Sequence, residues 1–279
     1  YVPNTGSTSQ TACSAGTYQP ASGQSSCIDA SAGYYVPTTA ATSQTACSAG
    51  TYQPDEGQTL CIDADAGYYV DTTAATSQTA CDLGTYQNQT AQTSCVDAPA
   101  GHYVNTTAAI NPTPCPLGTY QPATGQTGCL TASPGHYVDT NGSADQTPCL
   151  AGTYNPQSGS TSQAACIEAD IGHHVPSEGS MYQTECLAGS YQNVTGQSSC
   201  LSADPGYYVP SNASWFQVGC TAGTYQPMQG QTDCANASAG HYVPDHASPS
   251  QTTSLPTAPP RCAALPLNAA TPLVSALHA

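Results

Sequence analysis

Basic residues are almost absent from this chain of 279 residues. Arg261 is the single Lys or Arg residue, against 17 acidic residues, and the formal net charge is -16. Proteins that bind nucleic acid or anionic membrane surfaces do so with clustered Lys and Arg side chains. The composition therefore excludes a nucleic-acid partner and disfavours an anionic membrane.

Large apolar residues are the second scarcity. Leu, Ile, Val and Phe together number 30 of the 279 residues, and there is one Phe and one Trp. A chain with so little apolar material cannot build the interior of a large globular enzyme. It also lacks a 3.6-residue apolar period and any apolar stretch long enough to span a bilayer. We therefore expect little or no helix and no membrane insertion of this segment. We also expect that the protein is not an enzyme and has no catalytic residues.

The dominant feature of the chain is a tandem repeat. From Cys13 a 34-residue phrase runs seven times, and each copy consists of two similar halves of 17 residues. One half reads Cys-x2-Gly-x-Tyr-x8-Cys, as in Cys47–Cys61. The other half has Ala in place of the first Cys and Gln in place of the last, as in Ala64–Gln78. The chain must therefore be interpreted as an array.

The two cysteines of a half are replaced together. Where Ala30 replaces the first, Gln44 replaces the last, and this joint replacement recurs along the array, with Pro112 as a variation at the second position. Losing two positions in step is what the loss of one bond would produce. We therefore predict the disulfides Cys13–Cys27, Cys47–Cys61, Cys81–Cys95, Cys115–Cys129, Cys149–Cys166, Cys186–Cys200 and Cys220–Cys234. The competing pairing, Cys27 with Cys47 and so on, would close the other halves instead.

Regularly spaced cysteines also indicate a compartment. The chain has 15 cysteines with neither a Cys-x2-Cys motif nor a Cys/His cluster, which favours covalent bonds in an oxidising environment over metal ligands. One bond that closes a loop of about 15 residues contributes roughly 3 kcal/mol, so seven could supply most of the stability. We expect an extracellular protein, secreted or at the cell surface, with no metal and no other cofactor.

Glycines and aromatic rings recur at fixed phases. A Gly at one phase of each half indicates a positive φ or a close backbone approach. The short Tyr-containing pieces between Pro, Gly, Ser and Thr turns predict very short strands paired as hairpins. Five histidines stand where other copies have Tyr, and we interpret them as ring substitutes instead of metal ligands: His102, His136, His173, His174 and His241. The half from Cys149 to Cys166 has three extra residues, which we place near Ser158–Ser160 at an exposed tip.

Sequons for N-glycosylation are frequent. They occur at Asn88, Asn105, Asn141, Asn193, Asn212 and Asn236. Several share a phase of the repeat, and sequons in a secreted chain mark surface loops. We therefore predict covalent glycans on most of these side chains.

The frame Cys-x2-Gly-Thr-Tyr-x-Pro-x2-Gly-Gln-x2-Cys, clearest at Cys47–Cys61, resembles the ephrin-receptor-like cysteine-rich repeat, an extracellular module akin to those of tumour-necrosis-factor receptors. The resemblance extends from Cys13 to about Val243. It implies pairing of the cysteines that bracket each Gly-x-Tyr loop, and an elongated stack without chemistry of its own. The family normally joins its halves by Cys-x2-Cys, and Ala30 or Gln44 removes one cysteine of each such pair here. The fold class that we predict is small disulfide-rich repeats, mostly short β-hairpins and loops, stacked into an elongated rod.

The repeat register predicts three segments. Residues 1–12 are the end of a preceding repeat, residues 13–246 are seven tandem repeats, and residues 247–279 are a Pro-rich extended tail with an apolar end. The odd cysteine, Cys262, is expected to form an intermolecular bond; a bond to a part of the chain outside this sequence and a free thiol are the alternatives. We expect Leu265–Leu277 to pack on a neighbouring chain.

Repeats that contact only their neighbours make extended bodies. The sequence therefore favours a structural subunit of a secreted, glycosylated extracellular filament, surface appendage or matrix, whose partners are copies of itself or related repeat proteins. The alternative is the stalk or ectodomain of a cell-surface adhesin or receptor that binds protein or glycan ligands.

Overall fold

The computed structural model describes residues 1–2 and 9–253. The chain divides into two compact units: unit 1 is Tyr1–Cys186 with Gln192–Cys200, and unit 2 is Leu187–Tyr191 with Leu201–Ala279. Cys262 and the apolar segment Leu265–Leu277 lie outside the described residues.

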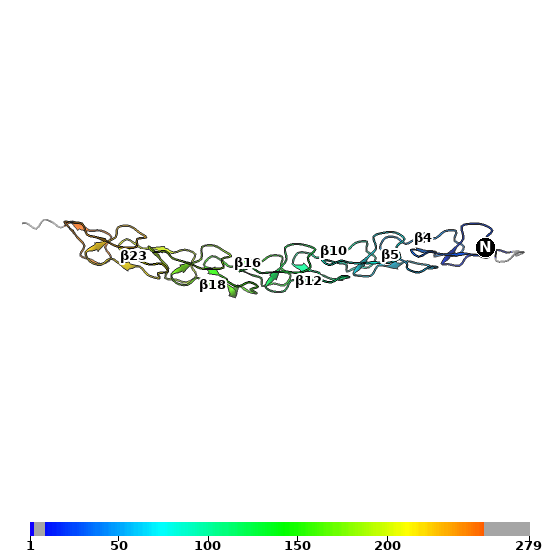
Figure 1. The fold of residues 1–279 in the computed structure, drawn as a ribbon, viewed down its shortest axis with the longest axis horizontal. Coiled ribbons are helices and arrows are strands. Elements are labelled where there is room, and N and C mark those ends of the chain that lie inside the picture. Colours follow the sequence, from blue (N-terminus) through cyan, green and yellow to red (C-terminus); the bar gives the residue numbers. More distant parts are fainter. Residues whose placement is uncertain (3–8, 254–279) are drawn as a thin grey trace, which may run out of the picture. The chain divides into compact units, whose positions relative to one another are not determined.

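Two-residue strands are the regular elements of both units, and each strand pairs with its sequence neighbour in an antiparallel hairpin (Figure 1). Unit 1 contains β1 (Thr17–Tyr18), β2 (Ile28–Asp29), β3 (Tyr34–Tyr35), β4 (Thr45–Ala46), β5 (Thr51–Tyr52), β6 (Ile62–Asp63), β7 (Tyr68–Tyr69), β8 (Thr79–Ala80), β9 (Thr85–Tyr86), β10 (Val96–Asp97), β11 (His102–Tyr103), β12 (Thr113–Pro114), β13 (Thr119–Tyr120), β14 (Leu130–Thr131), β15 (His136–Tyr137), β16 (Thr147–Pro148), β17 (Thr153–Tyr154), β18 (Ile167–Glu168), β19 (His173–His174) and β20 (Thr184–Glu185). Unit 2 contains β21 (Ser190–Tyr191), β22 (Leu201–Ser202), β23 (Tyr207–Tyr208), β24 (Val218–Gly219), β25 (Thr224–Tyr225), β26 (Ala235–Asn236), β27 (His241–Tyr242) and β28 (Thr252–Thr253). The one helical element of the described residues is the 3₁₀ turn η1 (Gln163–Ala165). The predicted class of disulfide-rich hairpin repeats with little helix is confirmed.

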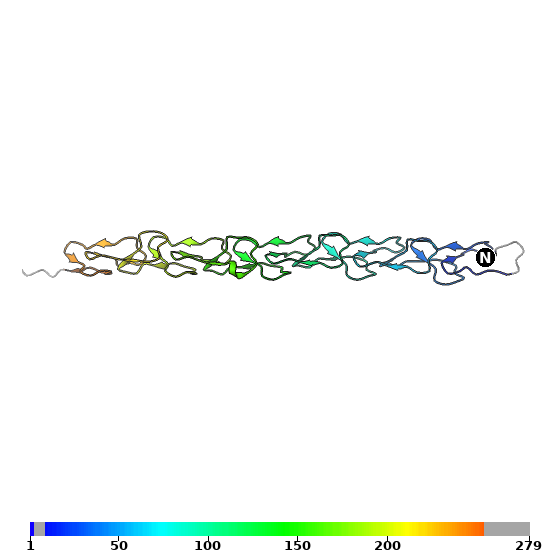
Figure 2. The same cartoon turned by 90° about the horizontal axis from the view of Figure 1, so that it is seen from below.

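Backbone hydrogen bonds join each hairpin to the next one. In unit 1 the N–H of Gly50, before β5, donates to the carbonyl of Val70 after β7 (2.8 Å). The N–H of Ala74, in the turn between β7 and β8, donates back to the carbonyl of Cys47 (2.8 Å). The same two bonds recur between successive hairpins within each unit, which follow one another in sequence order (Figure 2). An isolated two-stranded hairpin is marginal in water, so these bonds are what make such short strands stable.

A further contact reaches two hairpins ahead. Gly50 has a φ of +91°, and a Cβ built on it would overlap the backbone carbonyl of Ala91 in the turn between β9 and β10. The equivalent overlap occurs in unit 1 at Gly16, Gly33, Gly67, Gly84, Gly101, Gly118, Gly135 and Gly152, and in unit 2 at Gly189 and Gly206. Both reasons for a fixed Gly, the positive φ and the close approach, therefore hold at this position.

The turn that provides this carbonyl also has a positive φ, but it tolerates a side chain. At Gly57 a Cβ would lie 3.6 Å from the nearest atom, Oδ1 of Asp29, which is ordinary contact. Six copies hold alanine there, with φ between 54 and 60°: Ala40, Ala74, Ala91, Ala108, Ala213 and Ala247. The backbone strain of a left-handed alanine is the only cost at this turn.

The buried residues are small and alternate between the two kinds of half. Halves with a disulfide bury the first Cys and, except at Gln19, the Gln or Asn after the Tyr; the other halves bury a Val and, except at Ala237, the Ala. The buried Gln53 satisfies both ends of its amide, because Nε2 donates to the carbonyl of Leu60 (2.9 Å) and Oε1 accepts from the N–H of Asp55 (3.0 Å). A buried polar group that is fully hydrogen-bonded holds its own loop in shape.

The extra residues of the fifth repeat lie later than predicted. Gly159 and Ser160 keep the standard contacts: the N–H of Gly159 donates to the carbonyl of Ala132 (2.8 Å), and the carbonyl of Ser160 accepts from Val138 (2.9 Å). The insertion therefore falls within residues 161–165, which are mostly exposed and include η1. The placement at Ser158–Ser160 was wrong because the Ser- and Thr-rich stretch gives no sequence register.

The hairpin array also reaches beyond residue 246. The hairpin β27–β28 ends at Thr253, and the N–H of Ala247 in its turn donates to the carbonyl of Cys220 (2.8 Å). The start of the predicted tail therefore belongs to the last described hairpin.

The two glycine positions predict different mutational costs. Gly57→Ala should cost about 1–2 kcal/mol of backbone strain. Gly50→Ala should lower the free energy of unfolding by the same strain and by about 1–3 kcal/mol more from overpacking. The reason is that its Cβ meets a carbonyl that cannot move unless the hairpin β9–β10 moves with it. Urea unfolding followed by tyrosine circular dichroism compares the two variants. Equal losses of stability would refute the proposed close approach.

Candidate functional site

Seven disulfides are present in the described residues. They join Cys13 to Cys27, Cys47 to Cys61, Cys81 to Cys95, Cys115 to Cys129, Cys149 to Cys166, Cys186 to Cys200 and Cys220 to Cys234. The Cα atoms of each pair are 5.6 to 5.8 Å apart. The structure thus joins the two cysteines that bracket each Gly-x-Tyr loop. The first Cys of each pair is buried and the second is half-buried.

A glutamine side chain performs the linking role in the halves without a disulfide. Oε1 of Gln78 accepts from the backbone N–H of Asp65 (2.7 Å), and Nε2 of Gln78 donates to the Asp65 carboxylate (2.8 Å). Asp65 directly follows the Ala that replaces the first Cys. The same Gln-to-backbone bond, at 2.7 Å, recurs at Gln44, Gln146, Gln183, Gln217 and Gln251. The side-chain amide therefore joins the last position of the loop to the residue after its first position, one residue away from where a disulfide attaches in the other halves.

The single exception supports this interpretation. In the third repeat the acceptor is replaced by Pro112, and the residue that would donate is Pro99. Proline has no N–H to donate, so an acceptor would have no partner there. Donor and acceptor are therefore absent together, as the two cysteines are.

All six predicted sequons are exposed. Asn88, Asn105, Asn141, Asn193 and Asn212 lie in loops or turns, and Asn236 lies in β26. In unit 2 the Asn212 Oδ1 atom accepts from the N–H of Ala188 (3.0 Å). The exposure makes each side chain accessible to a glycosylating enzyme, and occupancy stays a prediction.

Four of the five histidines behave alike. Nδ1 of His102, His136, His173 and His241 lies 3.2 to 3.3 Å from the carbonyl two residues earlier. His174 differs, because its Nδ1 atom lies 3.1 Å from the sulfur of Cys200. His174, Cys186 and Cys200 are also the one group of three potential metal-binding side chains in the described part of the chain. The sequence interpretation treated all five alike and so missed this site. The signal was that His174 stands at the position of Tyr35, whereas the other four histidines stand at the position of Tyr34.

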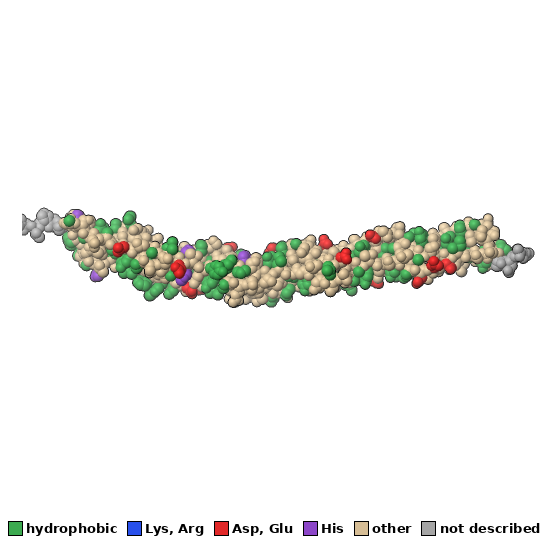
Figure 3. Space-filling model, in the orientation of Figure 1, with side chains coloured by type: hydrophobic (Ala, Val, Ile, Leu, Met, Phe, Trp, Pro, Cys, Tyr) green, Lys and Arg blue, Asp and Glu red, His purple; other side chains and the backbone are tan. Residues whose placement is uncertain are grey.

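The surface electrostatics follow the composition. On the face drawn in Figure 3 the acidic side chains are scattered among uncharged ones and do not gather into a patch. No helix among residues 1–2 and 9–253 has the length and apolar character needed to cross a membrane. Scattered carboxylates favour solubility and mutual repulsion over a localised cation site.

These features define a tandem array of disulfide-closed β-hairpin repeats. Residues 1–47 match the family described as tyrosine-protein kinase ephrin type A/B receptor-like. No curated protein matches the chain significantly. The matched residues include the first disulfide and the first two hairpins. Together with the other disulfides, this likeness indicates a module of the extracellular type, located outside the cell or at its surface.

The two ways of closing a loop predict different stabilities. Replacing Cys47 and Cys61 by Ala should cost about 3 kcal/mol, the value for a loop of this size. Gln78→Ala should cost about 1 kcal/mol, because it removes hydrogen bonds at a partly exposed site. Ser77→Ala, an exposed neighbour, is the control. The midpoints of denaturant unfolding test this order of stabilities. A Gln78→Ala variant as stable as Ser77→Ala would show that the amide does not close the loop.

The exposed sequons predict that the secreted protein is heavier than its polypeptide chain alone. The bare chain weighs 28.3 kDa. Protein secreted by a glycosylating host should be heavier, and each Asn→Gln change at an occupied sequon should remove one glycan from the intact mass. Enzymatic deglycosylation is the control. A secreted protein with the mass of the bare chain would disprove the glycoprotein prediction.

Proposed function

We propose that this chain is a structural subunit of a secreted, glycosylated extracellular filament, surface appendage or matrix. It acts without catalysis. Its partners are copies of itself or related repeat proteins. The support comes from a set of exposed aliphatic side chains that recur once in each of the first six repeats.

This aliphatic series lies at the first residue of the second strand in six of the seven disulfide-closed hairpins, and the seventh has Ala235 there. In unit 1 its members are Ile28, Ile62, Val96, Leu130 and Ile167, which are between 40 and 49% exposed. The halves without a disulfide have Thr at the equivalent position, as in Thr45 and Thr79, except for Val218 in β24. Apolar residues that repeat with the array and remain uncovered in one chain fit a partner with the same repeat.

Charge and glycans would shape such an assembly. A chain with net charge -16 repels its copies at long range, so apolar contacts must hold them at short range. A second joint is proposed at the tail, where Leu265–Leu277 would pack on the next chain and Cys262 would lock the contact. A contact of this heterologous kind that does not close into a ring produces a filament.

The aliphatic series can be removed with residues that the chain itself uses. In the variant Ile62→Thr, Val96→Thr and Leu130→Thr, three of the disulfide-closed hairpins receive the Thr of the neighbouring half. We expect lateral association to decrease at least tenfold by light scattering, and electron microscopy to show single filaments where the native protein forms bundles. The control is Leu83→Thr with Leu117→Thr, which removes exposed leucines outside the series.

Two outcomes oppose the proposal. Association that is unchanged in the series variant would exclude these residues as the contact. A native protein that stays monomeric by both methods would remove the filament, and deletion of the residues after Pro260 separates the end joint from the lateral one.

The alternative function is the stalk or ectodomain of an adhesin or receptor. One observation favours it: Trp215 and Phe216 are adjacent, 55% and 49% exposed, and 4.8 Å apart between ring centroids. The other copies have no aromatic pair at these positions, where they hold Thr42-Ser43, Thr76-Ser77, Ile110-Asn111, Ala144-Asp145, Met181-Tyr182 and Pro249-Ser250. A unique exposed aromatic pair fits one ligand site better than a repeated contact. A monomeric native protein would make this alternative the better one.

A further inference from the structure

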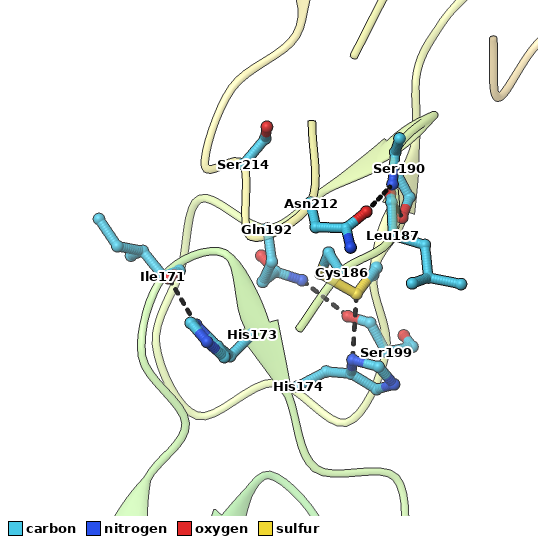
Figure 4. The surroundings of a disulfide bond; sticks show 12 residues. Ile171, His173, His174, Cys186, Leu187, Ser190, Gln192, Ser199, Asn212 and Ser214 are labelled. Carbon is cyan, nitrogen blue, oxygen red and sulfur yellow. Dashed lines mark hydrogen bonds between the residues drawn. A yellow bond between two sulfur atoms is a disulfide. The ribbon is translucent and has the colours of Figure 1, made fainter. Parts of the chain in front are cut away.

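One disulfide of the array has an imidazole beside it. Nδ1 of His174 lies 3.1 Å from Sγ of Cys200, which is bonded to Cys186 (Figure 4). The equivalent residues of the other halves are Tyr35, Tyr69, Tyr103, Tyr137, Tyr208 and Tyr242. The second cysteine is half-buried in all seven disulfides, so exposure does not distinguish this bond from the others.

Three potential ligands meet at this point. A ring nitrogen of His174 and the sulfurs of Cys186 and Cys200 all lie within 4.8 Å of one another. While the disulfide is intact its sulfurs are not thiolates, so the group cannot hold a metal ion. Two sulfurs bound to one tetrahedral Zn²⁺ lie about 3.8 Å apart, a separation compatible with the spacing of these three side chains once the bond is open.

The surrounding backbone holds His174 in place independently of the disulfide. The N–H of Val175 donates to the carbonyl of Gln197 (2.9 Å), and the N–H of Gly172 donates to Gln192 (2.7 Å). Nε2 of Gln192 donates to the carbonyl of Ser199 (2.8 Å), next to Cys200. These bonds would keep the imidazole beside Cys200 after reduction.

We propose that Cys186–Cys200 is the disulfide of this array most readily opened by a dithiol, and that its reduced form binds a thiophilic divalent cation such as Zn²⁺ through His174, Cys186 and Cys200. The inference does not depend on whether the chain assembles into filaments. His174 favours the reduced form because its N–H stabilises the thiolate of Cys200.

The exchange is balanced by the dithiol alone. One thiolate of the reagent attacks the half-buried sulfur of Cys200, and Cys186 leaves as a thiolate. The reagent is then held on Cys200 as a mixed disulfide. Its second thiolate attacks the reagent sulfur of this mixed disulfide, which closes a cyclic disulfide within the reagent and releases Cys200 as a thiolate. The reagent loses two electrons and the protein disulfide gains them. The cation then replaces any protons on the two sulfurs and on the ring nitrogen of His174 that it binds, and these protons go to solvent.

The first experiment maps which bond opens first. Native protein is treated with limiting dithiothreitol, the new thiols are alkylated, and the peptides are identified by mass. We expect Cys186 and Cys200 to be alkylated at least tenfold more than any other pair. His174→Tyr, which restores the ring of the other six copies, should abolish this preference. A preference that is absent in the native protein or unchanged in the variant would overturn the proposal.

The second experiment tests the ligands. Partly reduced protein freed of dithiol is titrated with Co²⁺, which reports thiolate ligation by charge-transfer absorption. We expect one site per chain and at least tenfold weaker binding in His174→Tyr with the same thiols free. Tyr103→His, before the pair Cys115–Cys129, should create a second readily reduced, Co²⁺-binding site. Equal Co²⁺ binding by the native protein and His174→Tyr would show that the imidazole is not a ligand.

Discussion

The contact between a turn carbonyl and the Cα of a glycine two hairpins earlier is the constraint on which the array depends. It explains why Gly50 and its counterparts cannot carry a side chain, whereas the turn at Gly57 can. It also joins hairpins of the same kind, because every second hairpin is disulfide-closed. The backbone bond from Gly50 to Val70 joins hairpins of different kinds. Together the two contacts make the full 34-residue repeat, not its half, the structural unit.

Covalent and polar links replace the hydrophobic core that this composition cannot build. The buried side chains are Cys, Ala, Val, Ser160 and the amide side chains of Gln and Asn, each small or internally hydrogen-bonded. Each loop is closed across its base by a disulfide or by a glutamine such as Gln78, except the loop that ends at Pro112. Aliphatic side chains are consequently free to remain on the surface, where Ile62 and its counterparts lie.

Much of this arrangement could be predicted from internal repetition. The joint replacement at Ala30 and Gln44 indicated the pairing of the cysteines, and the fixed glycines indicated positive φ. The role of Gln44 could not be predicted, because a spacing of 14 residues says nothing about which backbone N–H a side chain reaches. The insertion was misplaced because its Ser and Thr residues are interchangeable. The contact of His174 with Cys200 depends on how one hairpin lies against the next, which the sequence alone does not determine.

The disulfides have a mechanical consequence for a chain under tension. Cys47 and Cys61 are separated by 14 residues in sequence but only 5.8 Å between Cα atoms. A stretched chain reaches about 3.4 Å per residue, so that segment would otherwise contribute about 48 Å. Each disulfide therefore shortens the fully stretched length of its repeat by roughly 40 Å. The array would lengthen in limited steps under load, and its loops would remain closed and ready to refold when the force is released.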